Sequence, residues 1–277
     1  VYFHYKINNG SWQQFFSQGT SGSAYQSPGA WENITTQVSV NIGDEIEFRF
    51  RADVYGSNSY DELKFYIDRL EVGNFNIQSQ TGDVSFNNTD LAMDFLALNS
   101  NANFDNCNLN SSNGSSLGYN ASIKNSSISS LNGNGIIMCS PNTTLDVFNS
   151  TISNCALNGI TSISDFTNLS LQYSFIKDNN AVGIKTIGAT SHVNLSSCMV
   201  TGNSSYGVQS SGQVNSNYSN ITFNGDDGIF LTGNNFSNIK NSIVWGNDVV
   251  NYTQINTSSG VTSITYSTVQ GSGAYGT

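Results

Sequence analysis

One short pattern recurs in residues 145–184, which read LDVFNSTISNCALNGITSISDFTNLSLQYSFIKDNNAVGI. Each copy has an Ile or Val anchor, six further residues, a Gly, and then a second Ile or Val. The copies are Ile128/Gly135/Ile136, Ile152/Gly159/Ile160, Ile176/Gly183/Ile184, Val200/Gly207/Val208 and Ile221/Gly228/Ile229. Successive anchors lie 24, 24, 24 and 21 residues apart. A fixed period of this size predicts a solenoid, in which each rung buries its apolar face by stacking on its neighbours.

Each rung is predicted to contain two or three short strands separated by tight turns. Apolar residues lie seven and five positions before the anchor, as Leu169 and Leu171 do before Ile176, and a small residue lies two positions before it. Spacing of two is strand periodicity. The recurring Gly is expected where the backbone needs a positive φ or approaches another backbone closely. A helical solenoid is disfavoured, because no segment has sustained apolar spacing of three and four.

Fainter rungs extend the array in both directions. Phe104 and Leu109 fit upstream, and downstream Ile243 is interpreted as an anchor with Val250 where Gly is expected. About eight rungs at about 4.8 Å each predict a rod on the order of 40 Å long.

The rungs from about residue 104 resemble the right-handed parallel β-helix repeat family, an architecture shared by pectate lyases, polygalacturonases and many bacterial or archaeal surface proteins. Residues 241–247 and 263–271 look much like the closing rungs of large secreted bacterial β-helix proteins. The resemblance implies a right-handed parallel β-helix. It implies no particular activity, because a fold does not fix a function.

Residues 1–74 differ from the rest, since they hold all three Arg and all five Glu and lack the 24-residue spacing. Alternating segments such as residues 45–54 predict an antiparallel β-sandwich. Residues 64–72 resemble the last strand of jelly-roll domains appended to secreted proteins. Four or five strands are few for a sandwich, so earlier strands are expected before Val1. We therefore expect an all-β chain with a jelly-roll-like sandwich at 1–74, a transition or cap at 75–103 and the β-helix at 104–277.

Composition restricts the partners and the setting of the chain. The net charge is −10 with nine Lys plus Arg and no basic run, which disfavours nucleic acid and anionic membrane surfaces. No apolar run reaches the roughly eighteen residues of a membrane span. Low Lys content and seventeen Asn-x-Ser/Thr triplets favour an extracellular or cell-surface protein, with glycosylation left open. The cysteines, which are interpreted as small buried residues, are Cys107, Cys139, Cys155 and Cys198.

Asparagines form a column three positions after the anchor, at Asn179, Asn203 and Asn224. Stacked amides can donate and accept hydrogen bonds along the axis of a solenoid, and thereby satisfy buried turn backbones. We interpret this column as a structural ladder.

Residues 224–228, which read NGDDG, resemble the paired Asp of polygalacturonases. Inverting glycosidases need two carboxylates about 6.5–9.5 Å apart, and in that family further Asp and a His come from neighbouring rungs. Here the nearest His in sequence, His192, falls in a different column. No catalytic residue is therefore assigned. The simplest interpretation is an acidic turn flanked by Gly, and the alternative is weak Ca²⁺ binding by Asp226, Asp227 and Asp248.

A polyuronate lyase is disfavoured by the distribution of charge. Such an enzyme needs a strong base and cations that hold the anionic polymer. No Arg follows Arg69 and no Glu follows Glu71. Lys124, Lys177, Lys185 and Lys240 are assigned to four different columns, so no basic cleft is predicted.

Outward-facing aromatic residues are the candidates for stacking on sugars. In the first domain these are Trp12, Trp31 and Tyr55, and in the solenoid they are Phe148, Tyr173, Phe175, Tyr218 and Phe230, which alternation sends outward on more than one face. The competing interpretation is that each packs in a core or under a turn.

The leading functional hypothesis is a non-enzymatic structural or adhesive segment of a large extracellular or cell-surface protein, with glycans or other cell-surface components as partners and no cofactor beyond weakly bound Ca²⁺. One alternative is a polysaccharide-binding or polysaccharide-degrading β-helix that depends on Asp226 and Asp227. Another is a filament subunit that self-associates through open β-helix ends.

Overall fold

The computed structural model describes residues 2–7, 10–11, 13–17, 46–51, 65–67, 75–79, 84–91, 93–97, 101–248, 253–258 and 261–271. These residues form strands joined by turns, which confirms the all-β class. Across these ranges no helix has the length and apolar character needed to cross a membrane. The predicted carbohydrate-binding residues Trp12, Trp31 and Tyr55 lie outside the described residues, as does Val250.

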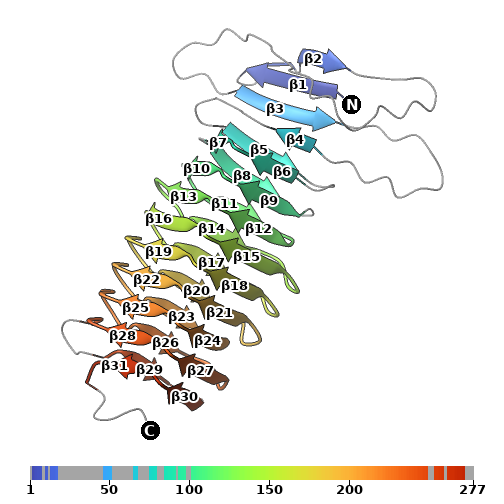
Figure 1. Ribbon diagram of the computed structural model, residues 1–277. Helices are drawn as coiled ribbons and strands as arrows, with labels where there is room; N and C mark the ends of the chain where they lie inside the picture. Colours follow the sequence, from blue (N-terminus) through green and yellow to red (C-terminus); the bar gives the residue numbers. More distant parts are fainter. Residues whose placement is uncertain are drawn as a thin grey trace.

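Three parallel sheets run along the stack of coils, as Figure 1 shows. Sheet B contains β4 (Phe65–Ile67), β6 (Val84–Asn87), β9 (Ala102–Asp105), β12 (Ala121–Lys124), β15 (Thr144–Phe148), β18 (Asn168–Gln172), β21 (His192–Ser196), β24 (Gln213–Asn217), β27 (Phe236–Lys240) and β30 (Val261–Thr265). Sheet C contains β5 (Phe75–Ser79), β8 (Met93–Ala97), β11 (Ser115–Leu117), β14 (Ile136–Met138), β17 (Ile160–Ser162), β20 (Ile184–Thr186), β23 (Val208–Ser210), β26 (Ile229–Leu231) and β29 (Ile255–Thr257). Sheet D contains β7 (Asp90–Leu91), β10 (Asn108–Ser111), β13 (Ser127–Ser130), β16 (Thr151–Cys155), β19 (Phe175–Lys177), β22 (Met199–Thr201), β25 (Asn220–Thr222), β28 (Ile243–Trp245) and β31 (Thr268–Val269). Each coil visits sheet B, then sheet D, then sheet C, which is the topology of a parallel β-helix.

The recurring anchors fill the interior of the coils, as predicted. Ile152, Ile176, Val200 and Ile221 pair in register along sheet D and are fully buried. The second Ile or Val of each copy stacks in the same way along sheet C. Each fully buried aliphatic side chain contributes about 1.5–3 kcal/mol, so the stacking of like residues is the main source of stability.

The prediction that Ile243 is an anchor is wrong. Val244 pairs with Ile221 and is 0% exposed, whereas Ile243 is 44% exposed. The spacing of the anchors varies between 21 and 24 residues, so Ile243 and Val244 both fit it and the spacing alone does not distinguish them. Ser242, two positions before Val244, holds the place of the small residue that precedes every other anchor, and it identifies the true register.

Parallel pairing begins earlier in the chain than residue 104. Phe65–Ile67, expected as the closing strand of a jelly roll, pairs instead in parallel with β6. Strands β5 to β9, which lie mostly within the expected transition, also pair in the long sheets.

A separate antiparallel sheet, sheet A, lies at the N-terminal end of the coils (Figure 1). It is formed by β1 (Tyr2–Ile7), β2 (Gln13–Ser17) and β3 (Ile46–Arg51), and β3 contacts β5 of sheet C. Antiparallel strands were expected in this part of the chain, but the remainder of the proposed sandwich falls outside the described residues.

The corner between sheets B and D, and in most coils the corner between sheets D and C, is turned by a single residue with positive φ. At the corner between sheets B and D, φ lies between 46° and 54°. The residues there are Asn88, Asn106, Asn125, Asn149, Tyr173, Ser197, Tyr218, Asn241 and Tyr266. At the corner between sheets D and C they are Asn154, Asp178, Gly202, Phe223, Gly246 and Gly271. Asn and Gly tolerate this left-handed conformation best, which accounts for much of the Asn and Gly content of the repeats.

The Gly of the recurring pattern serves close approach rather than positive φ. A Cβ on Gly183 would lie 2.6 Å from the carbonyl oxygen of Gly207 and 2.8 Å from Nδ2 of Asn203. The equivalent glycines stack directly above one another, and the amide of Ile184 donates to the carbonyl of Gly207 at 3.0 Å. A side chain at this position would therefore push neighbouring coils apart.

Candidate functional site

Asn179, Asn203 and Asn224 lie in one buried column beneath the corner between sheets D and C, and Asn247 continues it. Each Nδ2 donates to the Oδ1 of the next Asn, at 2.8, 2.9 and 2.8 Å. Each Oδ1 also accepts the backbone amide of the preceding column residue, beginning with Cys155. Gln254 ends the column by accepting from Asn247 at 2.8 Å. These side chains are fully engaged in holding the turns.

A second buried column lies beneath the corner between sheets B and D. The backbone amides of Ser126, Ser150 and Ser219 donate to the hydroxyl oxygens of the serines one coil further on, at 3.0–3.2 Å. Cys198 occupies a position in this column, and its amide donates to Ser219 Oγ at 3.1 Å.

The cysteines are free thiols. Burial raises the pKa of Cys107, Cys139 and Cys198, and raises that of Cys155 to about 11. High thiol pKa values mean little thiolate at neutral pH, so these groups are poor nucleophiles.

The acidic residues of the NGDDG turn do not assemble a metal site. Asp226 is exposed and accepts a hydrogen bond from Ser205 Oγ at 2.7 Å. Asp227 is buried and accepts from Asn256 Nδ2 at 3.1 Å. Asp248 is also buried. Within the described ranges no three His, Cys, Asp or Glu residues are grouped so that they could hold a metal ion, so the geometry lends no support to the alternative interpretation of weak Ca²⁺ binding.

Burial raises the pKa of the Asp227 carboxyl, and the nearby charges of Asp248 and Asp226 raise it further, against the hydrogen bond from Asn256, which lowers it. The pKa of Tyr206 is raised by burial and by the three nearby carboxylates. The Tyr206 ring stacks on Phe230, with ring centroids 4.9 Å apart. Phe230 is therefore half-buried in a packing contact on sheet C.

Two of the predicted aromatic candidates within the coils, Phe175 and Phe230, lie on different sheets. Phe175 is exposed on β19 of sheet D, whereas Phe230 lies on β26 of sheet C. They do not converge on one site.

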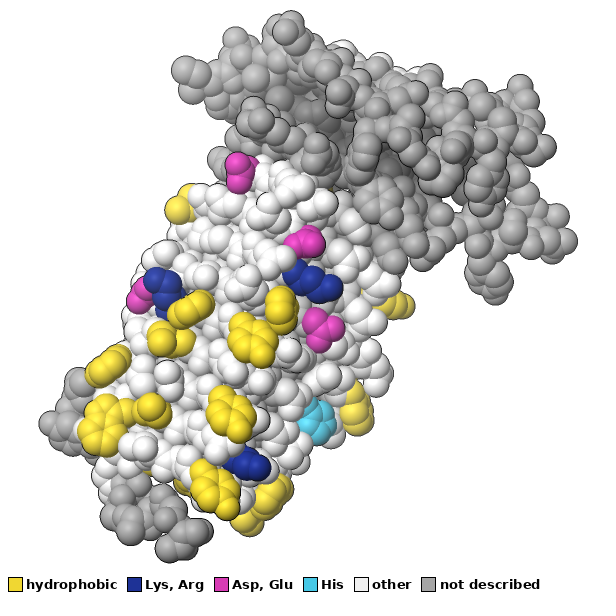
Figure 2. Space-filling view, viewed as in Figure 1, with side chains coloured by type: hydrophobic (Ala, Val, Ile, Leu, Met, Phe, Trp, Pro, Cys, Tyr) yellow, Lys and Arg dark blue, Asp and Glu magenta, His cyan; other side chains and the backbone are white. Residues whose placement is uncertain are grey.

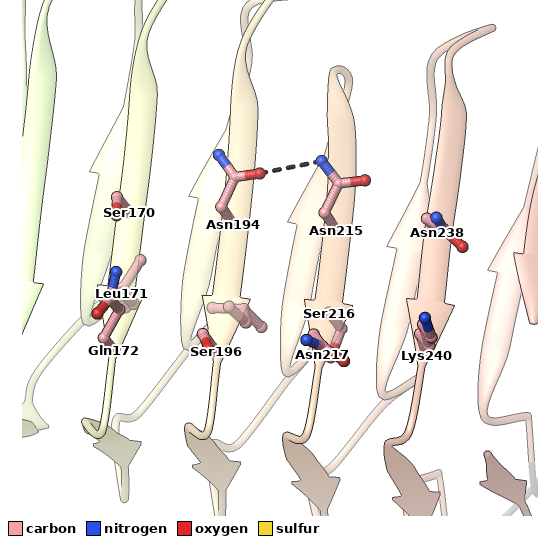
Figure 3. A pocket seen from close by; sticks show the side chains of 11 residues that line it. Ser170, Leu171, Gln172, Asn194, Ser196, Asn215, Ser216, Asn217, Asn238 and Lys240 are labelled. Atoms are coloured by element: carbon pink, nitrogen blue, oxygen red, sulfur yellow. Dashed lines mark hydrogen bonds between the residues drawn. The ribbon is translucent and has the colours of Figure 1, made fainter. Parts of the chain in front are cut away.

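A shallow groove of about 350 Å³ lies on the outer face of sheet B, where β18, β21, β24 and β27 run side by side. Alternation along these strands sends Leu171 and Leu195 inward and the polar residues between them outward. Figure 3 shows these outward side chains arranged in rows across the strands. The groove is lined mainly by Ser170, Gln172, Asn194, Ser196, Asn215, Asn217, Asn238 and Lys240.

Two amides in the middle row of the groove, Asn194 and Asn215, are joined by a hydrogen bond, and a second bond ties Asn194 to Asn168 in the neighbouring row. Asn215 Nδ2 donates to Asn194 Oδ1 at 2.9 Å (Figure 3), and Asn194 Nδ2 donates to Asn168 Oδ1 at 2.9 Å. Asn194 and Asn215 stand directly opposite one another in adjacent strands. The amides are thus held in position while other lone pairs and N–H groups remain open to a ligand.

The groove is almost uncharged. Lys240 is the sole ionisable residue among those that line it, and Figure 2 shows charged side chains only sparsely on this side of the described coils. The arrangement can form many neutral hydrogen bonds with a polyhydroxylated ligand, and it places no acid and base across from one another.

Sequence reasoning missed the groove, although a signal was present. The residue between the two buried apolar positions of each sheet B strand is polar in successive repeats, at Ser170, Asn194, Asn215 and Asn238. Outward positions are free to vary, so persistence of amides at one of them is informative.

Comparisons with known proteins agree with this architecture. The family described as "Right handed beta helix region" matches residues 112–269. Among solved structures, the A-module of mannuronan C-5 epimerase AlgE6 from Azotobacter vinelandii is similar, with a TM-score of 0.52 and 11% sequence identity, over 68% of this chain and 65% of that one. The chain thus corresponds to slightly less than two thirds of that module. No curated protein gave a significant match. Since the family match extends over more than half of the sequence, this chain belongs to the right-handed β-helix family.

Proposed function

We propose that the chain is a rigid, non-enzymatic glycan-binding segment of an extracellular or cell-surface protein, and that the groove on sheet B is its binding site. The observation that carries this proposal is the row of outward amides at Asn194, Asn215 and Asn238, which occupy the same position on adjacent strands of a parallel sheet. Parallel strands repeat the same position about every 4.8 Å, so the groove offers donors and acceptors at a regular interval along its length.

The groove is suited to sugar hydroxyls for two reasons. Amide side chains donate and accept, and hydroxyls do the same. The hydrogen bonds that link Asn168, Asn194 and Asn215 restrict their rotamers before any ligand arrives, which lowers the entropic cost of binding.

The charge of the chain favours a neutral glycan. The protein has a net charge of −10, and Lys240 alone in the groove cannot hold a polyuronate. The AlgE6 module is a mannuronan epimerase, but its likeness to this chain concerns the fold, and the acidity of this chain argues for an uncharged ligand.

The test is affinity electrophoresis and calorimetry with a panel of neutral polysaccharides, comparing the native chain with the double variant Asn194→Ala/Asn215→Ala. Binding by the native chain and loss of at least tenfold in the variant are expected. Asn103→Ala is the matched control, because Asn103 occupies the same outward row on β9, away from the groove. Absence of binding across the panel, or equal binding by the double variant, would refute the proposal. Release of reducing sugars or unsaturated uronides would refute its non-enzymatic part.

A further inference from the structure

The corner between sheets B and D carries three tyrosines in a conformation that tyrosine rarely adopts. Tyr173, Tyr218 and Tyr266 have φ of 51°, 52° and 51°. They are 57%, 63% and 75% exposed. A bulky residue in the left-handed region is an outlier.

The fold itself does not require aromatic residues at this corner. Five other coils turn the same corner with Asn, which tolerates the conformation better. Strained residues that persist where an easier choice exists tend to cluster at functional sites.

The tyrosines occupy alternate coils. Ser197 separates Tyr173 from Tyr218, and Asn241 separates Tyr218 from Tyr266. Two coil steps correspond to about 9.6 Å along the axis. This is close to the length of one disaccharide in an extended β-1,4-linked chain, in which every second sugar ring presents the same face to the same side.

Two tyrosines of the row, Tyr173 and Tyr218, border the groove on sheet B, and Tyr266 follows β30, one strand beyond the groove. Gln172 and Asn217, which line the groove, immediately precede Tyr173 and Tyr218. Asn241, between two of the rings, donates from Nδ2 to Asn217 Oδ1 at 3.1 Å. Phe148 meets Tyr173 edge to face at 5.6 Å. Aromatic rings and amides therefore lie along the same edge.

We propose that Tyr173, Tyr218 and Tyr266 form a stacking row for a neutral, extended β-1,4-linked glycan that runs parallel to the axis of the coils, with the amides of the groove bonding its hydroxyls. This inference rests on the proposed function and names the class of its ligand. Ser197 and Asn241, the residues between the rings, are uncharged, which matches a neutral chain.

The row also sets a length for the ligand. From Tyr173 to Tyr266 there are four coil steps, or about 19 Å, which corresponds to four or five sugar rings. Affinity for cello-oligosaccharides should rise from cellobiose to cellopentaose and change little beyond it.

The test is calorimetric titration of the chain with cello-oligosaccharides, using Tyr→Asn variants at the three positions. Asn is the residue that other coils place at this corner, so the variants should fold. Each single variant should weaken cellopentaose binding by about tenfold, as loss of an aromatic stacking partner does elsewhere, and the triple variant should abolish it. Tyr218→Phe, which keeps the ring, should bind like the native chain.

Phe166→Asn is the matched control, because Phe166 is also exposed and has a φ of 56° but turns a different corner. It should leave affinity unchanged. If the triple variant binds normally and Asn194→Ala/Asn215→Ala does not, the tyrosine row is not part of the binding site, and the proposal that the groove binds glycans is still supported. Failure of the native chain to bind any glycan would overturn both. Equal affinity for α-linked dextran would overturn the ligand class, and loss of self-association in the triple variant with intact glycan binding would assign the row to copies of the chain.

Discussion

Replacing Asn203 with Ala would remove one step from the buried asparagine column. Its Oδ1 accepts from Asn179 Nδ2 at 2.8 Å and from the backbone amide of Asn179 at 3.3 Å. Its Nδ2 donates to Asn224 Oδ1 at 2.9 Å and to the carbonyl of Ile176 at 3.2 Å. The substitution therefore removes an acceptor from two buried donors and a donor from two buried acceptors.

The expected cost follows from the stranded donors. A buried donor left without its partner costs about 1–3 kcal/mol, so the two donors of Asn179 together predict a loss of about 2–6 kcal/mol. A water molecule that enters the vacated space would bring the loss to the lower end of this range. Asn203→Asp should separate the two halves of the effect. It keeps the acceptor but buries a charge and removes the donor, so its loss should shrink as acid protonates the carboxylate.

Equilibrium unfolding in urea measures this loss, with the m-value as a check that the cooperative unit is unchanged. Solenoids can unfold in parts, so hydrogen exchange of the Asn179 amide supplies a local measurement. The control is Asn238→Ala on the exposed outer face of sheet B, for which a change within about 0.5 kcal/mol is expected. A loss below about 0.5 kcal/mol for Asn203→Ala would show that the column does not stabilise the turns.

Three further predictions concern single positions. Gly183→Ala should destabilise the chain by about 1–3 kcal/mol through overpacking, because the new Cβ would lie 2.6 Å from the Gly207 carbonyl oxygen. Gly202→Asn should cost less in the same urea assay, because Asn154 turns the same corner with positive φ and the new Cβ would closely approach only Oδ1 of Asp178, at 2.6 Å, on an exposed side chain that can move aside. Burial raises the pKa of Cys155 from 9.0 to about 11. The contribution of this thiol to the free energy of unfolding should be full below pH 9 and fall by about 3 kcal/mol as the pH rises to 11. Cys155→Ala should lose less stability over this pH range than the native chain, and parallel pH profiles of the two proteins would contradict the raised pKa. The pKa of Asp227 is raised in the folded state, so the protonated form that stabilises the fold is lost as the pH rises through the folded pKa. Asp227→Asn should therefore be more stable than the native chain at neutral pH and lose that advantage below pH 3.8, the unperturbed value. Thermal unfolding that shows no gain at neutral pH would contradict this prediction.

The sequence predicts the coils well because their interior is constrained at every rung. An anchor such as Ile176 has neighbours above and below that require an aliphatic residue of similar size. The repeat is therefore recognisable in the amino-acid sequence. Prediction fails where two residues satisfy the same approximate spacing, as Ile243 and Val244 do. It also fails for Phe65–Ile67, since a short apolar strand reads alike in an antiparallel and a parallel sheet.

The candidate site was harder to predict, because it depends on outward positions. Alternation shows that Tyr173 and Tyr218 face solvent, but it does not reveal that they turn a corner with positive φ. Phe230 was a candidate for stacking on sugars, with packing as the competing interpretation, and it stacks on Tyr206 of the preceding coil. No sequence signal links the two residues. Contacts between rungs become visible only when the register is known.

The asparagine column has a direction and two distinct ends. The Nδ2 groups of Asn179, Asn203 and Asn224 each donate a hydrogen bond to the next side chain toward the C-terminus. Gln254 ends the series, because its Nε2 donates back to the Asn247 carbonyl at 2.9 Å. Each Asn between these ends offers the same acceptor to the coil before it and the same donor to the coil after it. A whole coil can therefore be duplicated or deleted between these ends while every hydrogen bond of the column remains paired. The length of the rod can change in evolution in this way without any change to the residue that closes the column.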